Sequence, residues 1–120
     1  MTILVAVSDS ADGRFALDAA ADEARRFETD LVALNLTPRR LEPAGLPRDI
    51  ALLVVEGAGD AGDHADVVLD YLQRPPEEDR LLIGVRRRTP VGKAVFGSTR
   101  QRLLLDSPVP VLAVRPPATD

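Results

Sequence analysis

The sequence contains no cysteine, one histidine and one methionine among its 120 residues, and aromatic residues make up only 3% of it. The absence of cysteine excludes disulfides, thiol catalysis and thiolate metal sites. A lone histidine, His64, argues against a zinc site built on imidazoles, and we interpret it as a surface or helix-capping residue. So few aromatic side chains provide no stacking platform of the kind that single-stranded nucleic acids require.

Long apolar runs are also missing, since none approaches the roughly 20 residues that a transmembrane helix needs. Residues 1–7 begin an apolar stretch with no basic flank before it, so the pattern of a cleavable signal is absent. We therefore expect a cytoplasmic protein that does not bind membranes. Apolar residues make up 45% and charged residues 28% of the chain, a balance typical of a globular domain. We expect a single domain over residues 1–116 and a short tail over 117–120.

Basic charge is concentrated in one part of the chain. The net charge is −4, which disfavours general binding to nucleic acid. Between Arg80 and Leu105, however, there are seven basic residues and no acidic residue. These basic residues are Arg80, Arg86, Arg87, Arg88, Lys93, Arg100 and Arg102. A basic segment in an acidic chain indicates a local anion site, and the alternative is a solvated loop that balances its acidic neighbours.

Five apolar runs predict strands. They cover residues 3–7, 31–36, 50–55, 80–83 and 109–114. Continuous rather than alternating apolarity is typical of strands buried on both faces of a parallel sheet. Helices are predicted between them, over about 10–27, 63–73 and 98–106, and the first should bury an apolar face that reaches Phe27. Three prolines and Gly45 argue against a helix between residues 37 and 48.

Strands that alternate with helices predict the α/β class. We expect a three-layer sandwich around a five-stranded parallel sheet with the order 3-2-1-4-5. The strand order then reverses between the first and fourth strands, and ligands of such sheets bind beyond the carboxyl ends of the strands at that reversal. Ser8 and Asp9 follow the first strand, while Gly84 and the basic loop follow the fourth. The strand order and the charge distribution therefore predict the same position for a ligand site.

The loop from Gly84 to Thr99 has the chemistry of an anion site. Gly84 ends a buried strand and would let a ligand approach the backbone closely. Gly97, Ser98 and Thr99 open a helix, where unpaired N–H groups and the helix dipole favour an anion. The two hydroxyls can also donate to phosphate oxygens. The alternative is that Ser98 is only an N-cap and Gly97 only a turn residue.

Three other kinds of site find little support. A Walker A loop is excluded, because Ala94 follows Lys93 and Arg87 stands where the motif requires its first glycine. Ser98 has no histidine partner in the sequence, so we expect no catalytic residues and no enzyme. Asp9 could hold Mg²⁺ together with a phosphate oxygen, or it could simply be a turn aspartate, which is the interpretation we favour.

The stretch from Gly84 to Ser98 resembles the signature of the universal stress protein family, which is a glycine, two residues, a second glycine, nine residues, and then Gly-Ser or Gly-Thr. Residues 5–10 are similar to the first strand and following turn of that family, and residues 108–114 to its last strand. The resemblance covers nearly the whole chain. The motif is a variant, because Arg87 occupies the place of the second glycine and Ser8 the place of an acidic residue.

Several expectations follow from this resemblance. It implies a Rossmann-like sandwich, similar to the adenine nucleotide alpha hydrolases, with a role in stress physiology. It implies a homodimer paired through the last strand, from Val109 to Val114. It also implies that ATP or another adenine nucleotide is the ligand, which Mg²⁺ could accompany if Asp9 holds it as described above. The residues that match nucleotide-binding positions are Val7, Ser8 and Leu36 for the adenine, and Gly84, Gly97, Ser98 and Thr99 for the ribose and phosphates, with Asp9 and Arg87 beside them.

Arg87 leaves two functions open. Its side chain could clamp the phosphate, or it could fill the space that the phosphate needs. In the second case the protein would be a ligand-free dimeric interaction module whose protein partner the sequence does not identify. Slow ATPase activity rests on family analogy alone.

Overall fold

The computed structural model describes residues 2–8, 11–41, 45–46, 49–57, 64–73, 80–84 and 98–115. The elements in chain order are β1 (Thr2–Val7), α1 (Ala11–Arg26), β2 (Asp30–Asn35), β3 (Leu52–Glu56), α2 (His64–Leu72), β4 (Arg80–Gly84), α3 (Ser98–Asp106) and β5 (Val111–Val114). The strands form one parallel sheet in the order β3-β2-β1-β4-β5. The predicted fold class and strand order are therefore confirmed.

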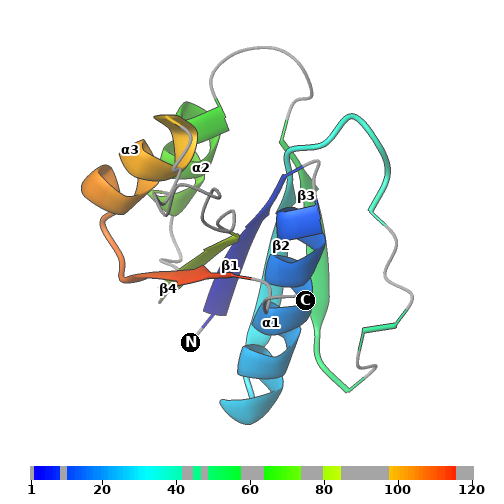
Figure 1. Ribbon diagram of the computed structural model, residues 1–120. Coiled ribbons are helices and arrows are strands. Elements are labelled where there is room, and N and C mark those ends of the chain that lie inside the picture. The colour runs from blue at the N-terminus through cyan, green and yellow to red at the C-terminus, as the bar shows by residue number, and fades with distance from the viewer. Residues whose placement is uncertain are drawn as a thin grey trace, which may run out of the picture.

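Helices cover both faces of this sheet, which gives three layers (Figure 1). Helix α1 packs on one face, and α2 and α3 contact each other on the opposite face. The protein has two hydrophobic cores, one on each face of the sheet, and the side chains of each central strand alternate between them. In β1, Ile3 and Val5 pack under α1, whereas Leu4 and Ala6 pack under α2 and α3. This division explains why the sequence of β1 is continuously apolar.

The two edge strands are more exposed and shorter than expected. Leu53 of β3 has 57% of its surface exposed and Leu112 of β5 has 42%. The strands begin at Leu52 and Val111, two residues later than the apolar runs predict. Ile50 and Val109 lie before the paired strands and are only partly buried against the two cores. Apolarity at these positions therefore reflects packing rather than strand pairing.

Helix α1 approaches β1 very closely at its first turn. A Cβ atom added to Gly13 would lie 2.1 Å from the carbonyl oxygen of Ser8 and 2.7 Å from the Ser8 nitrogen, distances that no side chain can occupy. The glycine therefore permits the helix to begin directly against the end of the strand. Further along, Ala16, Leu17 and Ala20 are buried as predicted.

Phe27, which was expected on the buried face of α1, is 44% exposed. The helix ends at Arg26, and the chain then turns through Glu28, whose φ is 51°. The N–H of Thr29 donates to the carbonyl of Ala24 at 2.9 Å, and that of Glu28 to the carbonyl of Arg25 at 3.3 Å. These bonds form a Schellman motif, which turns the chain out of the helix just where Phe27 stands.

The described parts of the crossover between β2 and β3 contain no helix, as the prolines predict. Leu41, Leu46 and Ile50 from this segment pack partly buried on the α1 side of the sheet. Of the helices that the structure describes, none combines the length and apolarity needed to cross a membrane.

Candidate functional site

The carboxyl ends of β1 and β4 lie side by side where the strand order reverses. Ala6 pairs with Ile83, so the next residues, Val7 and Gly84, end two neighbouring strands. Both are buried, and Gly84 also pairs with Val114 of β5. The structure thus brings together two of the predicted site residues at the position where open α/β sheets bind ligands.

Leu36 and Ser8 extend this edge of the sheet. The N–H of Leu36 donates to the carbonyl of Val7 at 3.0 Å, which joins the end of β2 to the end of β1. The Leu36 side chain is 5% exposed and packs in the core under α2 and α3. A ligand at this edge would therefore meet the backbone of Leu36. Ser8 is half-buried, and its backbone lies against Gly13.

The structure describes only some of the remaining predicted site residues. Ser98 is the first residue of α3, and Thr99 is half-buried in its first turn, so the helix begins where the sequence predicts. Asp9, Arg87 and Gly97 lie outside the described residues.

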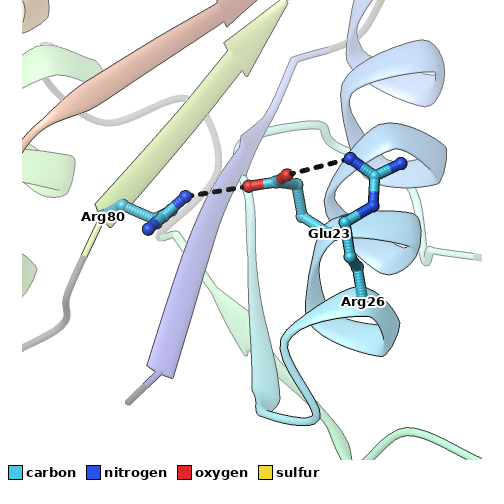
Figure 2. Close-up of polar contacts among 3 residues, drawn as sticks. All are labelled: Glu23, Arg26 and Arg80. Carbon is cyan, nitrogen blue, oxygen red and sulfur yellow. Dashed lines mark hydrogen bonds and ion pairs between the residues drawn. The ribbon is translucent and has the colours of Figure 1, made fainter.

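Arg80, the first of the seven basic residues, points away from the predicted site. It begins β4, and so lies at the amino end of the sheet. Its Nη1 is 3.0 Å from Oε2 of Glu23, and its guanidinium carbon is 4.9 Å from the centroid of the Phe27 ring. Figure 2 shows Glu23 between Arg80 and Arg26, whose Nη1 is 4.0 Å from Oε1 of Glu23.

Arg102, another of the seven, forms ion pairs with two aspartates. It contacts Asp66 of α2 and lies 3.7 Å from Asp106 of α3. Two basic residues counted toward an anion site therefore stabilise contacts between elements instead. Arg86, Arg87, Arg88 and Lys93 lie outside the described residues.

Asn35, which the sequence did not single out, is the one buried polar side chain among the residues that the structure describes, with 0% of its surface exposed. Its Nδ2 donates to the carbonyl of Arg39 at 2.7 Å and to Oε2 of Glu56 at 2.9 Å. Its Oδ1 accepts from the N–H and the hydroxyl of Thr37 at 3.0 and 2.7 Å. A polar residue inside the apolar run 31–36 was the only signal in the sequence.

Further bonds extend this network along the carboxyl edge. The Thr37 hydroxyl lies 2.8 Å from the carbonyl of Arg39 and accepts from the Arg39 N–H at 3.1 Å. The N–H of Gly57 donates to the carbonyl of Asn35 at 2.8 Å, and a Cβ on Gly57 would lie at the same distance from that oxygen. The ends of β1, β2 and β3 are thus linked by hydrogen bonds into one continuous edge.

A cavity of about 500 Å³ lies at the opposite end of the sheet, beside the end of α1 and the start of β2. It is lined by Ala24, Arg25, Glu28, Thr29, Asp30, Asp49, Ile50 and Ala51. None of the predicted site residues lines this cavity. Within the described ranges, no group of three or more acidic or histidine side chains could hold a metal ion.

Both the sequence and the fold of the chain are similar to those of known proteins. The chain is 34% identical over 134 residues to a universal stress protein of Mycolicibacterium smegmatis, and the match covers 94% of this chain and 98% of that protein. Among solved structures it is similar to a universal stress protein from Archaeoglobus fulgidus, with a TM-score of 0.70, 22% identity, and coverage of 94% and 97% of the two chains. A universal stress protein in complex with cAMP gives a TM-score of 0.65 at 18% identity, with 96% of each chain covered. No protein-family model matches the chain.

Proposed function

The chain belongs to the universal stress protein family, and on that premise we propose that it is a small regulatory protein of the stress response that binds an adenine nucleotide at the carboxyl ends of β1 and β4. One observation carries the proposal, namely that Val7 and Gly84 end neighbouring strands at the reversal of strand order. Open α/β sheets bind ligands at this place. The cAMP complex of a similar protein supports an adenine nucleotide as the ligand class.

The residues present fit such a ligand. The backbone of Val7 and Leu36 would border the base, because their side chains are buried in the two cores. Gly84 has no side chain to obstruct the ribose, and the first turn of α3, with Ser98 and Thr99, would direct N–H groups at phosphate oxygens. Mg²⁺, where it accompanies the nucleotide, would bind phosphate oxygens and the carboxylate of Asp9.

Isothermal titration with ATP, ADP and cAMP tests the proposal. We expect binding of at least one of them, with a rise in the thermal midpoint, because a ligand that binds only the folded state stabilises it. Absence of both heat and thermal shift at millimolar nucleotide would refute a nucleotide function. Release of phosphate from ATP no faster than in buffer is expected, since we propose no catalytic residues.

A second candidate function is favoured by the exposed edge at β5. Leu112 is 42% exposed on a strand whose outer side pairs with no other described strand, and such an edge invites a further strand. Under this alternative the protein is a dimeric interaction module whose nucleotide space is filled by Arg87.

Replacing Arg87 by glycine separates the two functions. If Arg87 clamps the phosphate, Arg87→Gly weakens ATP binding, because a charge-assisted contact is lost. If Arg87 fills the phosphate space, Arg87→Gly creates binding that the unaltered protein lacks. The location of the protein in the cytoplasm stays a prediction, which cell fractionation can test.

A further inference from the structure

Strand β3 forms one edge of the sheet, and among the strands that the structure describes it pairs only with β2 (Figure 1). The N–H of Leu31 donates to the carbonyl of Ala51 at 2.9 Å, so the backbone of Ala51 faces β2. The direction of backbone groups alternates along a strand. The N–H and C=O groups of Leu52, Val54 and Glu56 therefore point away from the sheet.

This outer edge of β3 is open. No residue in the described part of the chain bonds to the outward backbone groups. Proteins usually protect such an edge with a charged residue, a proline or a bulge within the strand. The run from Leu52 to Val55 contains neither charge nor proline, and its register with β2 is unbroken. The edge can therefore accept a further strand.

The exposed side chains of β3 indicate what such a strand would contain. Leu53 is 57% exposed and Val54 is 37% exposed. They lie on opposite faces of the sheet, because Leu53 pairs with Val32 of the core under α2 and α3, whereas Val54 pairs with Ala33 of the core under α1. A strand that covers both side chains would be apolar on both of its faces.

Both ends of this edge are acidic. Glu56 is exposed at the end of β3, and the bond from Nδ2 of Asn35 to its Oε2, at 2.9 Å, holds the carboxylate there. Just before the strand, the cavity of about 500 Å³ is lined by three acidic side chains and one basic side chain. The acidic ones are Glu28, Asp30 and Asp49, and the basic one is Arg25. An added strand therefore meets negative charge at both ends, whichever direction it runs.

We propose that the outer edge of β3 binds an extended segment of another protein as an added strand, and that this segment is apolar in its middle and basic at both ends. Backbone bonds to Leu52, Val54 and Glu56 would provide affinity, and the charged ends would select the segment. A second copy of this chain does not fit. Twofold pairing of two β3 strands is antiparallel and brings the acidic ends of the two copies together.

Fluorescence anisotropy with the full chain and a labelled peptide, Arg-Lys-Val-Val-Thr-Val-Val-Lys-Arg, tests this inference. We expect saturable binding that weakens as salt is added, because salt screens the attraction at the charged ends. The same peptide with glutamate in place of its four basic residues should not bind. A peptide with proline in place of its threonine should not bind either, because it loses a backbone donor at its centre.

Val54→Pro tests the backbone edge. It removes an outward N–H but no bond to β2, and proline is tolerated on an edge strand in this orientation. We expect the peptide to bind about tenfold more weakly, the effect of one hydrogen bond together with obstruction by the ring. Val54→Ile keeps the N–H and should bind within about twofold of the unaltered protein. Far-UV circular dichroism checks that both variants fold.

Asp49→Asn tests the charge without altering the strand. The Asp49 side chain is 59% exposed and lies 3.2 Å from Nε of Arg25. Loss of its charge should weaken peptide binding about twofold to fivefold and reduce the effect of salt. Asp106→Asn is the matched control before β5, at the opposite edge. Asp106 is 57% exposed and lies 3.7 Å from Nε of Arg102, and its substitution should leave the peptide affinity unchanged.

Each outcome supports or overturns the inference. Absence of peptide binding at millimolar concentration overturns it, as does equal binding by Val54→Pro and the unaltered protein. Equal losses in Asp49→Asn and Asp106→Asn refute recognition by charge at this edge, and they decide the matter even if Val54→Pro does not fold. A smaller oligomer for Val54→Pro in light scattering would show that a second copy occupies the edge instead.

Discussion

At the scale of single residues, Glu28 has a strained backbone conformation just after the end of α1. Its φ of 51° lies in the left-handed region, where the Cβ of any residue but glycine crowds the backbone. The Schellman bonds of Glu28 and Thr29 fix this conformation after the helix. The strain is local, because the Glu28 side chain is exposed and no neighbour depends on it for packing.

Glu28→Gly should therefore stabilise the protein. Relief of the left-handed strain outweighs the entropy that glycine adds to the unfolded chain, and we expect a gain of about 0.5–1 kcal/mol in the free energy of unfolding. Urea denaturation measures this gain. Glu28→Ala retains a Cβ and serves as the control. Equal stability of the glycine and alanine variants would show that the backbone at this position carries no strain.

At the scale of elements, Arg80 connects β4 to the end of α1. The Glu23 side chain is only 16% exposed and that of Arg80 32%, so their ion pair is partly shielded from water. Arg26, on the other side of Glu23 in Figure 2, is 74% exposed and more distant. Glu23 thus has one partly shielded partner, Arg80, and one solvated partner, Arg26. The contributions of the two ion pairs to stability can therefore be compared.

We expect Arg80→Met to lower the free energy of unfolding by about 1–2 kcal/mol, because Glu23 would keep a half-buried charge with a weaker partner and Phe27 would lose its cation. Arg26→Met should cost less than about 0.5 kcal/mol, as exposed pairs do. Chemical denaturation of both variants gives the comparison. Similar losses in the two variants would contradict the structural role of Arg80.

The elements also show what the sequence could predict. The apolar runs of β1, β2 and β4 are separated by helices and breakers, and those strands were predicted within one or two residues. The edge strands were predicted too early, because Ile50 and Val109 are apolar for packing rather than pairing. Phe27 was misplaced because the left-handed turn at Glu28 has no glycine to signal it.

The sequence predicts which strand ends meet at the candidate site, but it does not predict the hydrogen bonds that link them. Val7 and Gly84 follow from strand order, which alternating elements largely determine. The network of Asn35 could not be predicted, because one of its partners, Glu56, is 21 residues away and another is a backbone carbonyl. Hydrogen bonds of this kind depend on register and turn geometry, which residue type does not encode.

At the scale of the whole molecule, the sheet ends in two exposed edges that differ in their expected role. We propose that β5 pairs with the β5 of a second copy, whereas nothing in the family resemblance implies pairing at β3. Both edges carry an exposed leucine, Leu112 on β5 and Leu53 on β3. These residues make a matched pair of positions for charge substitution.

Leu112→Lys should shift the protein toward monomer, because two lysines brought together across the twofold axis repel each other and lose apolar contact. Leu53→Lys, on the other edge, should leave the oligomeric state of the protein unchanged. Light scattering across a range of concentrations measures both. A monomer for the unaltered protein at every concentration would refute the dimer.

We propose that the carboxyl edge of the sheet binds an adenine nucleotide. Chemical-shift mapping of backbone amides by NMR during titration with ATP tests it most directly. We expect the largest shifts at Ser8, Leu36 and Gly84, with little change at Asp30 and Asp49 beside the cavity at the opposite end. Shifts concentrated at that cavity, or no shifts with any of ATP, ADP and cAMP at millimolar concentration, would contradict it.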